Sequence, residues 1–361
     1  MVADGLRLSV YFGERDRAGG RLLAGRLIEL YAEHGVCTSV LLRGIEGFGL
    51  EHQLASERLL TLSEDLPLLA LAVDEPARIR ELASRAQALS PRGVLTLERA
   101  RTLHAPFDAA ELSPGSQDVK LTVYVGRQER IGGRAAYLAI VECLHRHGVA
   151  GASVMLGLDG TLAGARRRAR FLARNAQVPL MIQSVGEAGA ILAALERIAA
   201  IAEDPAVTLE RVLVCKRDGA LLAEPSPPPH ADAAGLDYWQ KLVVYTSERS
   251  RHRGQPLHSE LVRRLRREGA SGATVLRGLW GYHGAHRPHG EAFWSLGRHV
   301  PVLTVLIDTP ENTRRWFAIV DELTSETGLV TSELVPALRA GAAGVQRGGL
   351  ALAERHGQSP G

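Results

Sequence analysis

The sequence contains only three cysteines, Cys37, Cys143 and Cys215, among its 361 residues. No two of them form a Cys-x-x-Cys pair, and each lies within an apolar stretch. This odd number and wide spacing argue against a disulfide framework and are typical of buried thiols in a reducing compartment.

The sequence also lacks a strong net charge, a long apolar run and a signal peptide. Its formal net charge is +3, which is too small for this length to indicate a nucleic acid or a membrane surface as partner. No stretch approaches the ~18 apolar residues of a membrane helix, and the first residues do not combine a basic segment with an apolar one. We therefore expect a cytoplasmic protein without direct membrane insertion.

Enzyme signatures are missing as well. The sequence has no Gly-x-Ser-x-Gly elbow, no Walker A lysine, no His-Glu-x-x-His and no cluster of cysteines. The glycines Gly44, Gly47 and Gly49 have the wrong spacing for a dinucleotide-binding fingerprint. These absences predict a protein that binds and senses and is not an enzyme.

What the sequence does contain is one unit written three times. The segment Leu8–Gly13 recurs at 121–126 and at 242–247, always with tyrosine in fourth place. The segment Arg43–Phe48 recurs at 277–282, and the middle version at 156–161 keeps both glycines but has leucine in place of arginine. Further downstream the repeated markers are Asp65-Leu66-Pro67, Gln177-Val178-Pro179 and His299-Val300-Pro301, then Thr96-Leu97-Glu98, Thr208-Leu209-Glu210 and Thr331-Ser332-Glu333.

These markers divide the chain into three copies that cover residues 5–104, 118–216 and 238–338. Residues 105–117 and 217–237 are predicted to be linkers because they are rich in proline, serine and glycine. Residues 341–361 have weak periodicity and are predicted to be a disordered tail.

Within a copy, strand and helix periods alternate in the order βαββαβ. Leu6, Leu8, Val10 and Phe12 alternate with polar residues, whereas Leu23, Leu27 and Leu30 repeat at helical spacing. This order predicts an α+β fold of three tandem ferredoxin-like domains, each with a four-stranded antiparallel sheet and both helices on one face. The other face, which includes Tyr11, Tyr124, Tyr245, Lys120 and Thr122, would stay open. Three open faces within one chain predict packing around a pseudo-threefold axis.

The segments Tyr11–Arg17, Arg43–Gly49 and Ser63–Pro67 resemble the PII-like family listed as domain of unknown function 190. The resemblance covers almost the whole chain outside the linkers and the tail, and it is weakest in the second copy. It implies a PII/CutA-like pseudo-trimer, because relatives with this fold are homotrimeric signalling proteins. Those relatives bind adenine nucleotides in clefts between subunits and signal through a long loop between the second and third strands. Members of this family are similar to proteins encoded near fluoride channels, which suggests a membrane transporter or channel as partner.

Two departures from true PII proteins bear on this expectation. Only Pro91-Arg92-Gly93 stands where a phosphate loop rich in glycine and lysine would lie. The connection between the second and third strands, about residues 43–60, has no tyrosine for modification.

The first candidate ligand site is formed by Arg43, Gly44, Glu46 and Gly47, with Arg277 and Gly278 as its third-copy counterpart. Guanidinium groups can bind an anion through two parallel hydrogen bonds, and glycines allow a ligand to approach the backbone. Because the middle copy has Leu156 in place of the arginine, at most two of the three clefts would be fully equipped. The alternative is that the glycines serve only the backbone conformation at a strand end.

The second candidate consists of Arg17, Arg130 and Arg251, which occupy equivalent places before the first helix of each copy. A helix amino terminus beside an arginine favours anions. The alternative is a surface arginine or a salt bridge, with Glu14 and Glu248 as partners.

The third candidate is the string His283, His286 and His289, since imidazoles bind zinc, copper or nickel. Its spacing fits no standard metal site, and the other copies lack it. The sequence therefore leaves three hypotheses open. The chain is a PII-like regulatory protein that binds a small anionic ligand, with an adenine nucleotide as one candidate. It is alternatively a CutA-like metal or ion homeostasis protein, or a purely structural interaction module.

Overall fold

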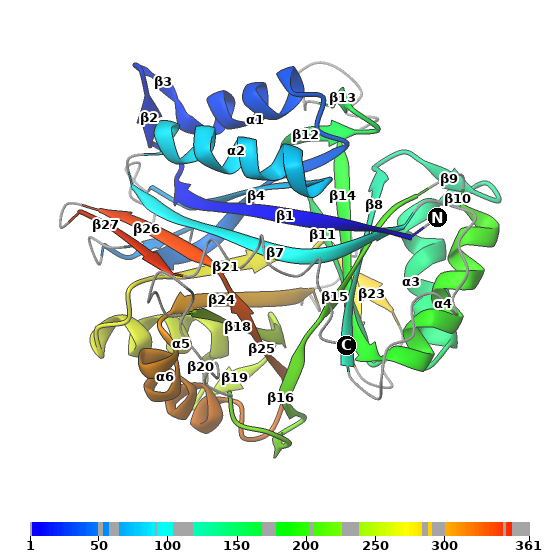
Figure 1. The fold of residues 1–361 in the computed structure, drawn as a ribbon. Helices are drawn as coiled ribbons and strands as arrows, with labels where there is room; N and C mark the ends of the chain where they lie inside the picture. The colour runs from blue at the N-terminus through cyan, green and yellow to red at the C-terminus, as the bar shows by residue number, and fades with distance from the viewer. Residues whose placement is uncertain are drawn as a thin grey trace, which may run out of the picture.

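The computed structural model describes residues 2–49, 53–57, 65–90, 92–103, 118–167, 178–202, 205–225, 238–283, 288–290, 300–341 and 344–348. Three helix pairs lie on the outside of the molecule, and the strands between them fill its centre (Figure 1). None of the helices in these ranges combines the length and the hydropathy needed to cross a bilayer.

Copy 1 contains seven strands and two helices within the described ranges. They are β1 (Val2–Gly13), β2 (Arg17–Ala18), β3 (Arg21–Leu22), α1 (Leu23–Glu33), β4 (Thr38–Phe48), β5 (Ala55–Ser56), β6 (Pro67–Asp74), α2 (Pro76–Leu89) and β7 (Gly93–Leu103).

Copy 2 repeats this order with a divided second strand and an extension after its last strand. Its elements are β8 (Asp118–Gly126), β9 (Arg130–Ile131), β10 (Arg134–Ala135), α3 (Ala136–Arg146), β11 (Gly151–Leu156), β12 (Asp159–Leu162), β13 (Ala165–Arg166), β14 (Pro179–Glu187), α4 (Ala188–Ile201), β15 (Ala206–Arg211), β16 (Leu213–Arg217) and β17 (Ala220–Leu221).

Copy 3 has the same plan. Its elements are β18 (Trp239–Ser247), β19 (Arg251–His252), β20 (Gln255–Pro256), α5 (Leu257–Arg267), β21 (Ala273–Arg277), β22 (Trp280–His283), β23 (His289–Gly290), β24 (Pro301–Asp308), α6 (Pro310–Leu323), β25 (Leu329–Val335), β26 (Ala337–Gly341) and β27 (Gly344–Gly348).

The four long strands of each copy pair antiparallel in the same order. That order is β7-β1-β6-β4 in copy 1, β15-β8-β14-β11 in copy 2 and β25-β18-β24-β21 in copy 3. The first helix of each copy ends as the sequence predicts, because Gly35, Gly148 and Gly269 follow it with positive φ angles of 60°, 73° and 89°. The chain therefore has a mostly antiparallel α+β fold built from three repeats.

Four apolar clusters hold these elements together. Three of them each lie mainly between one helix pair and the sheet of its own copy, with a few residues added by a neighbouring copy, such as Ile45 and Phe48 of copy 1 in the copy 3 cluster. The fourth draws residues from all three copies, including Leu69, Met181 and Leu303 from the third strands and Tyr124 and Tyr245 from the first strands. The sheet faces that carry no helices thus pack against one another, which confirms the predicted position of Tyr124 and Tyr245.

Strand pairing between copies closes two rings. The end of β7 pairs with β15, β16 pairs with β25, and β26 pairs with the start of β7, so the fourth strands join copy 1 to copy 2, copy 2 to copy 3 and copy 3 to copy 1. The second strands close a ring in the opposite sense, because β4 pairs with β21, β22 with β11, and β12 with β4.

Two predicted boundaries differ from the structure. Residues 217–221 were expected in a linker but include the end of β16 and the strand β17, which pairs back on β16. Residues 344–348 were expected in a disordered tail but form β27, which pairs with β26. In both places the segment is ordered because its backbone forms hydrogen bonds with the edge of a neighbouring strand. Side-chain periodicity does not indicate such pairing. The rest of the predicted linkers and tail lies largely outside the described residues.

Candidate functional site

The glycines of the first candidate site lie where one copy meets another. Gly44 and Gly47 are on the part of β4 that pairs with β21 of copy 3. A Cβ atom at Gly47 would lie 2.4 Å from the carbonyl oxygen of Ala273, and one at Gly44 would lie 2.9 Å from that of Val275. The glycines therefore allow two backbones to approach closely.

The same close approach recurs at the other two interfaces. A Cβ at Gly160 would lie 2.0 Å from the carbonyl oxygen of Ser39, and one at Gly281 would lie 2.2 Å from that of Ala152. A Cβ at Gly278 would lie 3.1 Å from the carbonyl oxygen of Val154 in copy 2. Contact between copies thus explains the glycine pattern in all three copies, including the middle one that lacks the arginine.

The arginines of this motif are already engaged by carboxylates. Arg43 donates to Glu14 at 2.9 Å on the surface, and Arg277 donates to Glu57 of copy 1 at 2.6 Å. Arg277 also lies 3.7 Å from Glu248. Glu14 and Glu248, expected beside the other arginine set, therefore pair with Arg43 and Arg277.

Glu46, the acid of the same motif, is buried in the interface between copies 1 and 3. Its carboxylate accepts a 2.7 Å hydrogen bond from the hydroxyl of Ser259 on α5 and lies 3.9 Å from the ring of His258. Its position marks it as a contact between copies.

The second candidate set stays within its own turns. Arg17 and Arg130 each donate a 2.8 Å hydrogen bond to a carbonyl oxygen three residues ahead, that of Gly20 or Gly133. Arg251 donates to the carbonyl oxygen of Glu248 at 2.6 Å. These three arginines stabilise the short hairpins that precede α1, α3 and α5.

The histidine string is only partly described. His283 ends β22 and lies 2.6 Å from a carboxylate oxygen of Asp218. His289 belongs to β23, and His286 lies outside the described residues. The three cysteines are not in disulfides, and Cys143 and Cys215 are buried as predicted, but Cys37 is only half-buried.

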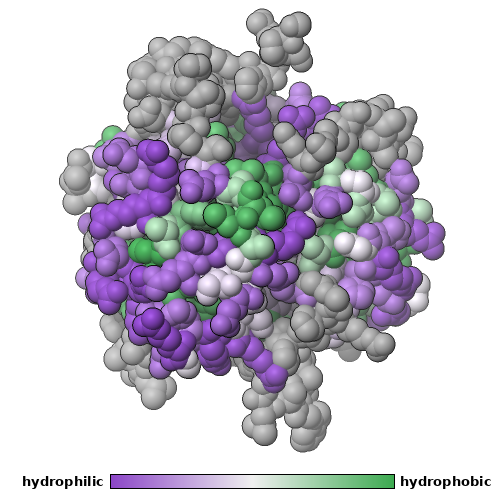
Figure 2. Space-filling model, turned by 90° about the horizontal axis from the view of Figure 1, so that it is seen from below, coloured by the Kyte–Doolittle hydropathy of each residue, from purple (hydrophilic) through white to green (hydrophobic). Residues whose placement is uncertain are grey.

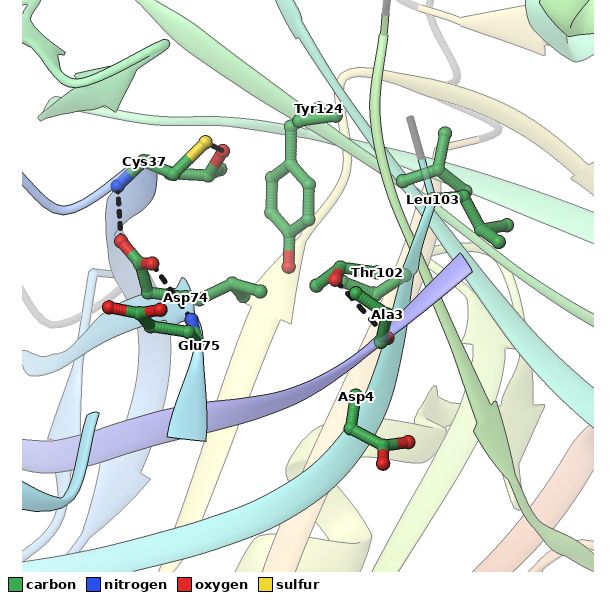
Figure 3. Close-up of a pocket in the computed structure, with 13 residues that line it drawn as sticks. Ala3, Asp4, Cys37, Asp74, Glu75, Thr102, Leu103 and Tyr124 are labelled. Carbon is green, nitrogen blue, oxygen red and sulfur yellow. Dashed lines mark hydrogen bonds between the residues drawn. The ribbon is translucent and has the colours of Figure 1, made fainter. Parts of the chain in front are cut away.

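A cavity of about 160 Å³ lies between copies 1 and 2. Its lining from copy 1 includes Cys37, Asp74 and Thr102, and its lining from copy 2 includes Tyr124 and Thr208. Figure 3 shows the phenol ring of Tyr124 reaching toward the space between Asp74 and Thr102, with its hydroxyl at the tip. Asp74 is held in place because it accepts hydrogen bonds from the backbone of Cys37 at 2.7 Å and from Arg78 at 2.9 Å.

The hydroxyl of Tyr124 is buried without a satisfied hydrogen bond. The hydroxyl of Thr208 is the polar neighbour of Tyr124, and a side-chain hydrogen bond between them acts to lower the pKa of Tyr124. Among the described residues this contact falls short of full hydrogen-bond geometry for either hydroxyl. Burial is the main reason that the pKa of Tyr124 is raised. An unpaired buried hydroxyl costs free energy, and a bound molecule can recover that cost.

At the centre of the molecule, six charged side chains form a ring that joins all three copies. Each copy supplies one base from its first strand and one acid from its last strand, and all six are at most 8% exposed. The members are Arg7 and Glu98 from copy 1, Lys120 and Glu210 from copy 2, and Lys241 and Glu333 from copy 3.

Each base of the ring contacts the acid of its own copy and the acid of at least one other copy. Arg7 binds Glu98 and, at 2.6 Å, Glu210. Lys120 lies 2.8 Å from Glu210 and 2.6 Å from Glu333. Lys241 lies 3.0 Å from Glu333 and also binds Glu98, which closes the ring.

The electrostatics of the ring follow from burial and mutual pairing. Burial opposes ionisation of Glu98, but the charges of Arg7, Lys241 and Lys120 outweigh it and hold its pKa well below the usual range. The pKa of Glu333 is lowered in the same way, chiefly by Lys120 and Lys241. The carboxylates of Glu98, Glu210 and Glu333 lie within 4.8 Å of one another, as metal ligands do. The three bases already bind them, so the ring is neutral as it stands.

Sequence reasoning missed both the ring and the cavity. The ring did leave a signal, because the acids belong to the repeated Thr-x-Glu marker and the bases occupy one aligned position of the first strand. The cavity left none, because Tyr124 and Thr208 recur in every copy, and the residues that distinguish this interface, such as Cys37, do not recur.

The surface also carries exposed apolar side chains. Figure 2 shows such side chains gathered near the centre of one face, within a hydrophilic surround. Large exposed apolar residues include Leu213 on β16, Leu221 on β17 and Leu334 on β25. We assign no binding role to them, because nothing in the described residues indicates a partner.

The family model DUF190, described as "Uncharacterized ACR, COG1993", matches the chain three times, over residues 5–102, 118–214 and 239–337. The chain belongs to this family. The family description names no activity. Membership therefore establishes the repeated domain but indicates no function.

Curated relatives correspond to single copies. The UPF0166 protein of Methanocaldococcus jannaschii is 30% identical over 89 residues, which are 25% of this chain and 82% of that protein. The UPF0166 protein of Aquifex aeolicus is 30% identical over 93 residues, which are 26% of this chain and 86% of that protein. Among solved structures, aspartate kinase from Synechocystis covers 95% of this chain and 46% of its own, with 11% identity and a TM-score of 0.26. That score is too low to indicate a shared fold.

Proposed function

We propose that this chain is a PII-like regulatory protein and not an enzyme. Its three DUF190 copies act as ferredoxin-like units of a single-chain pseudo-trimer. A small ligand bound in a cleft between copies changes the segments that join the second and third strands. Those segments then contact a partner, for which a membrane transporter or channel is the first candidate.

The observation that carries the proposal is the closed pairing between copies. The strand order β7-β1-β6-β4 and its two counterparts match the order of a ferredoxin-like sheet. The fourth strands and the second strands each close a ring through all three copies, and the six-charge ring closes a third. Such closure supports a pseudo-trimer complete within one chain.

The cavity between copies 1 and 2 is our preferred ligand site. It lies at an interface between copies and contains the buried hydroxyl of Tyr124, which makes no hydrogen bond of full geometry among the described residues. The anionic ligand expected from the sequence remains a prediction for Arg43 and Arg277. Because carboxylates already pair with both guanidinium groups, an anion there has to displace Glu14 or Glu57.

The test is a thermal-shift titration with adenine nucleotides, small amines and amides, and divalent metal ions as separate arms. A molecule that binds the native state raises the melting temperature by mass action. Ala206→Leu should abolish the effect, because Leu329 fills the equivalent place in copy 3 and the larger side chain would fill the cavity. The double variant Arg43→Ala/Arg277→Ala should leave it unchanged.

Light scattering after size exclusion tests the assembly. We expect the mass of one chain, or of two chains at most. A mass three times that of the chain would overturn the pseudo-trimer, and the absence of any stabilising small molecule would overturn the regulatory role. Stabilisation by zinc or copper that His283→Ala removes would favour the metal-homeostasis alternative.

A further inference from the structure

The three interfaces between copies are alike in backbone but not in side chains. At the interface of copies 1 and 2, Tyr124 of copy 2 faces Cys37 and Asp74 of copy 1 across the cavity. In the repeat alignment, Tyr245 and Tyr11 are the counterparts of Tyr124. The three interfaces can therefore be compared residue by residue.

At the interface of copies 2 and 3, the tyrosine hydroxyl is satisfied. Gln183 donates a 2.8 Å hydrogen bond to the hydroxyl of Tyr245. In copy 1, Leu71 holds the position of Gln183 on the equivalent strand and offers no hydrogen bond to Tyr124. The amide of Gln183 thus shows what kind of group a tyrosine at this position binds.

At the interface of copies 3 and 1, an arginine occupies the equivalent space. Arg339 on β26 binds the hydroxyl of Ser271, which is the counterpart of Cys37. Its guanidinium lies 5.5 Å from the ring centre of Trp239. Among the described residues, the interface of copies 1 and 2 has neither the amide nor the guanidinium.

The lining of the cavity selects against anions. Its described lining includes the carboxylates of Asp4, Asp74 and Glu75, while Arg78, which pairs with Asp74 at 2.9 Å and with Glu75 at 3.3 Å, does not line it. Carboxylate oxygens accept hydrogen bonds from N–H groups and offer no donor to a phosphate or a carboxylate. The two closed interfaces use N–H donors of this kind, the amide of Gln183 and the guanidinium of Arg339.

We propose that the cavity between copies 1 and 2 binds one small molecule per chain, and that this molecule carries an N–H donor and no negative charge. The N–H group donates to the hydroxyl oxygen of Tyr124, as Gln183 does to Tyr245. This inference rests on the proposed function, because it takes the cavity as the regulatory site and names its ligand class.

The half-buried thiol of Cys37 provides a direct test. Iodoacetamide and iodoacetate are nearly the same size and form the same kind of thioether, but one ends in a neutral amide and the other in an anion. The rate of modification at Cys37 is followed by peptide mass spectrometry for both reagents. The buried Cys143 and Cys215 serve as internal references, and the unfolded chain gives the intrinsic rate ratio of the two reagents.

We expect the folded protein to raise the preference for iodoacetamide at Cys37 about fivefold or more above that intrinsic ratio, as one hydrogen bond would. Tyr124→Phe should lower the iodoacetamide rate and leave the iodoacetate rate unchanged. Tyr245→Phe, the matched change at a closed interface, should alter neither. Ala206→Leu should slow both reagents because it fills the cavity.

The proposed ligand class would be overturned if the ratio of the iodoacetamide rate to the iodoacetate rate at Cys37 equalled the ratio in the unfolded chain. Identical iodoacetamide rates in the Tyr124→Phe variant and the parent would overturn it as well. A phosphorylated molecule that protects Cys37 would also overturn it while leaving the regulatory role standing. If the preference holds but no molecule stabilises the protein, the regulatory role fails and the N–H-selective site remains.

Discussion

Arg7 and Glu210 lie 203 residues apart in the sequence and form a buried 2.6 Å ion pair at the centre of the molecule. Arg7 belongs to copy 1 and Glu210 to copy 2, and the same guanidinium also binds Glu98 of its own copy. One side chain therefore joins the first and last strands of one repeat to the last strand of the next.

Removing the charge of Arg7 should be strongly destabilising. Arg7→Met leaves Glu98 and Glu210 buried with fewer cations, and breaking a buried pair on one side typically costs about 3–5 kcal/mol. Arg7→Lys, which introduces the base used by copies 2 and 3, should cost much less. Urea unfolding of both variants measures the difference in the free energy of unfolding. Equal losses of stability in the two variants would mean that the shape of the arginine side chain and not its charge matters at this position.

The ring should also make the protein sensitive to acid. Because the pKa values of Glu98 and Glu333 are lower in the folded chain than in the unfolded one, their contribution is complete above the ordinary glutamate pKa and is lost as the pH falls below it. We expect the melting temperature to fall from about pH 4.5 downward.

The control for this acid dependence is Glu142→Gln. Glu142 also has a lowered pKa, through hydrogen bonds from Arg146 and Arg134, but it lies on the surface where solvent screens the pair. Glu98→Gln should flatten the acid dependence and Glu142→Gln should not. Equal flattening by the two variants would contradict a dominant role for the ring.

The interface glycines should not tolerate a methyl group. Gly47→Ala places a Cβ against the carbonyl oxygen of Ala273 and should cost about 1–3 kcal/mol by overpacking. Gly25, in the first turn of α1, has open space around it, so Gly25→Ala should stabilise by up to about 1 kcal/mol through helix propensity. Thermal unfolding distinguishes the two, and a neutral Gly47→Ala would show that the copies separate easily at this edge.

The two interface tyrosines should respond in opposite ways to loss of the hydroxyl. Tyr245→Phe leaves the amide of Gln183 buried without its partner and should cost about 1–3 kcal/mol. Tyr124→Phe removes a hydroxyl that has no satisfied hydrogen bond, so stability without ligand should stay the same or rise. Chemical denaturation reports both values, and a large loss for Tyr124→Phe would mean that its hydroxyl is already satisfied in the protein.

Much of the architecture could be predicted because it repeats. The apolar periods of Leu8–Gly13 and its counterparts, together with the caps at Gly35, Gly148 and Gly269, are local signals present three times. The open sheet face also follows from strand alternation alone, which is why Tyr124 could be placed. The residues at 344–348 show the opposite case, since their order depends on an edge supplied by β26.

The candidate site could be predicted only in part. The Arg-Gly motif was noticed because it repeats, but repetition marks what the copies need in common, and here that is close backbone contact at Gly44 and Gly47. The cavity depends on differences, namely leucine at position 71, glutamine at 183 and arginine at 339. The sequence does not state which of these side chains meet across an interface, because that depends on how the copies pack.

Joining the three copies in one chain has a genetic consequence. In a homotrimer encoded by a single short gene, every substitution appears at all three interfaces at once. A side chain that fills the cavity at one interface therefore fills it at all three. Here Gln183 and Arg339 each fill a single interface, and Cys37 and Tyr124 face each other at another. Each interface is free to change under its own selection, so the three interfaces can share their backbone pairing while their side chains differ.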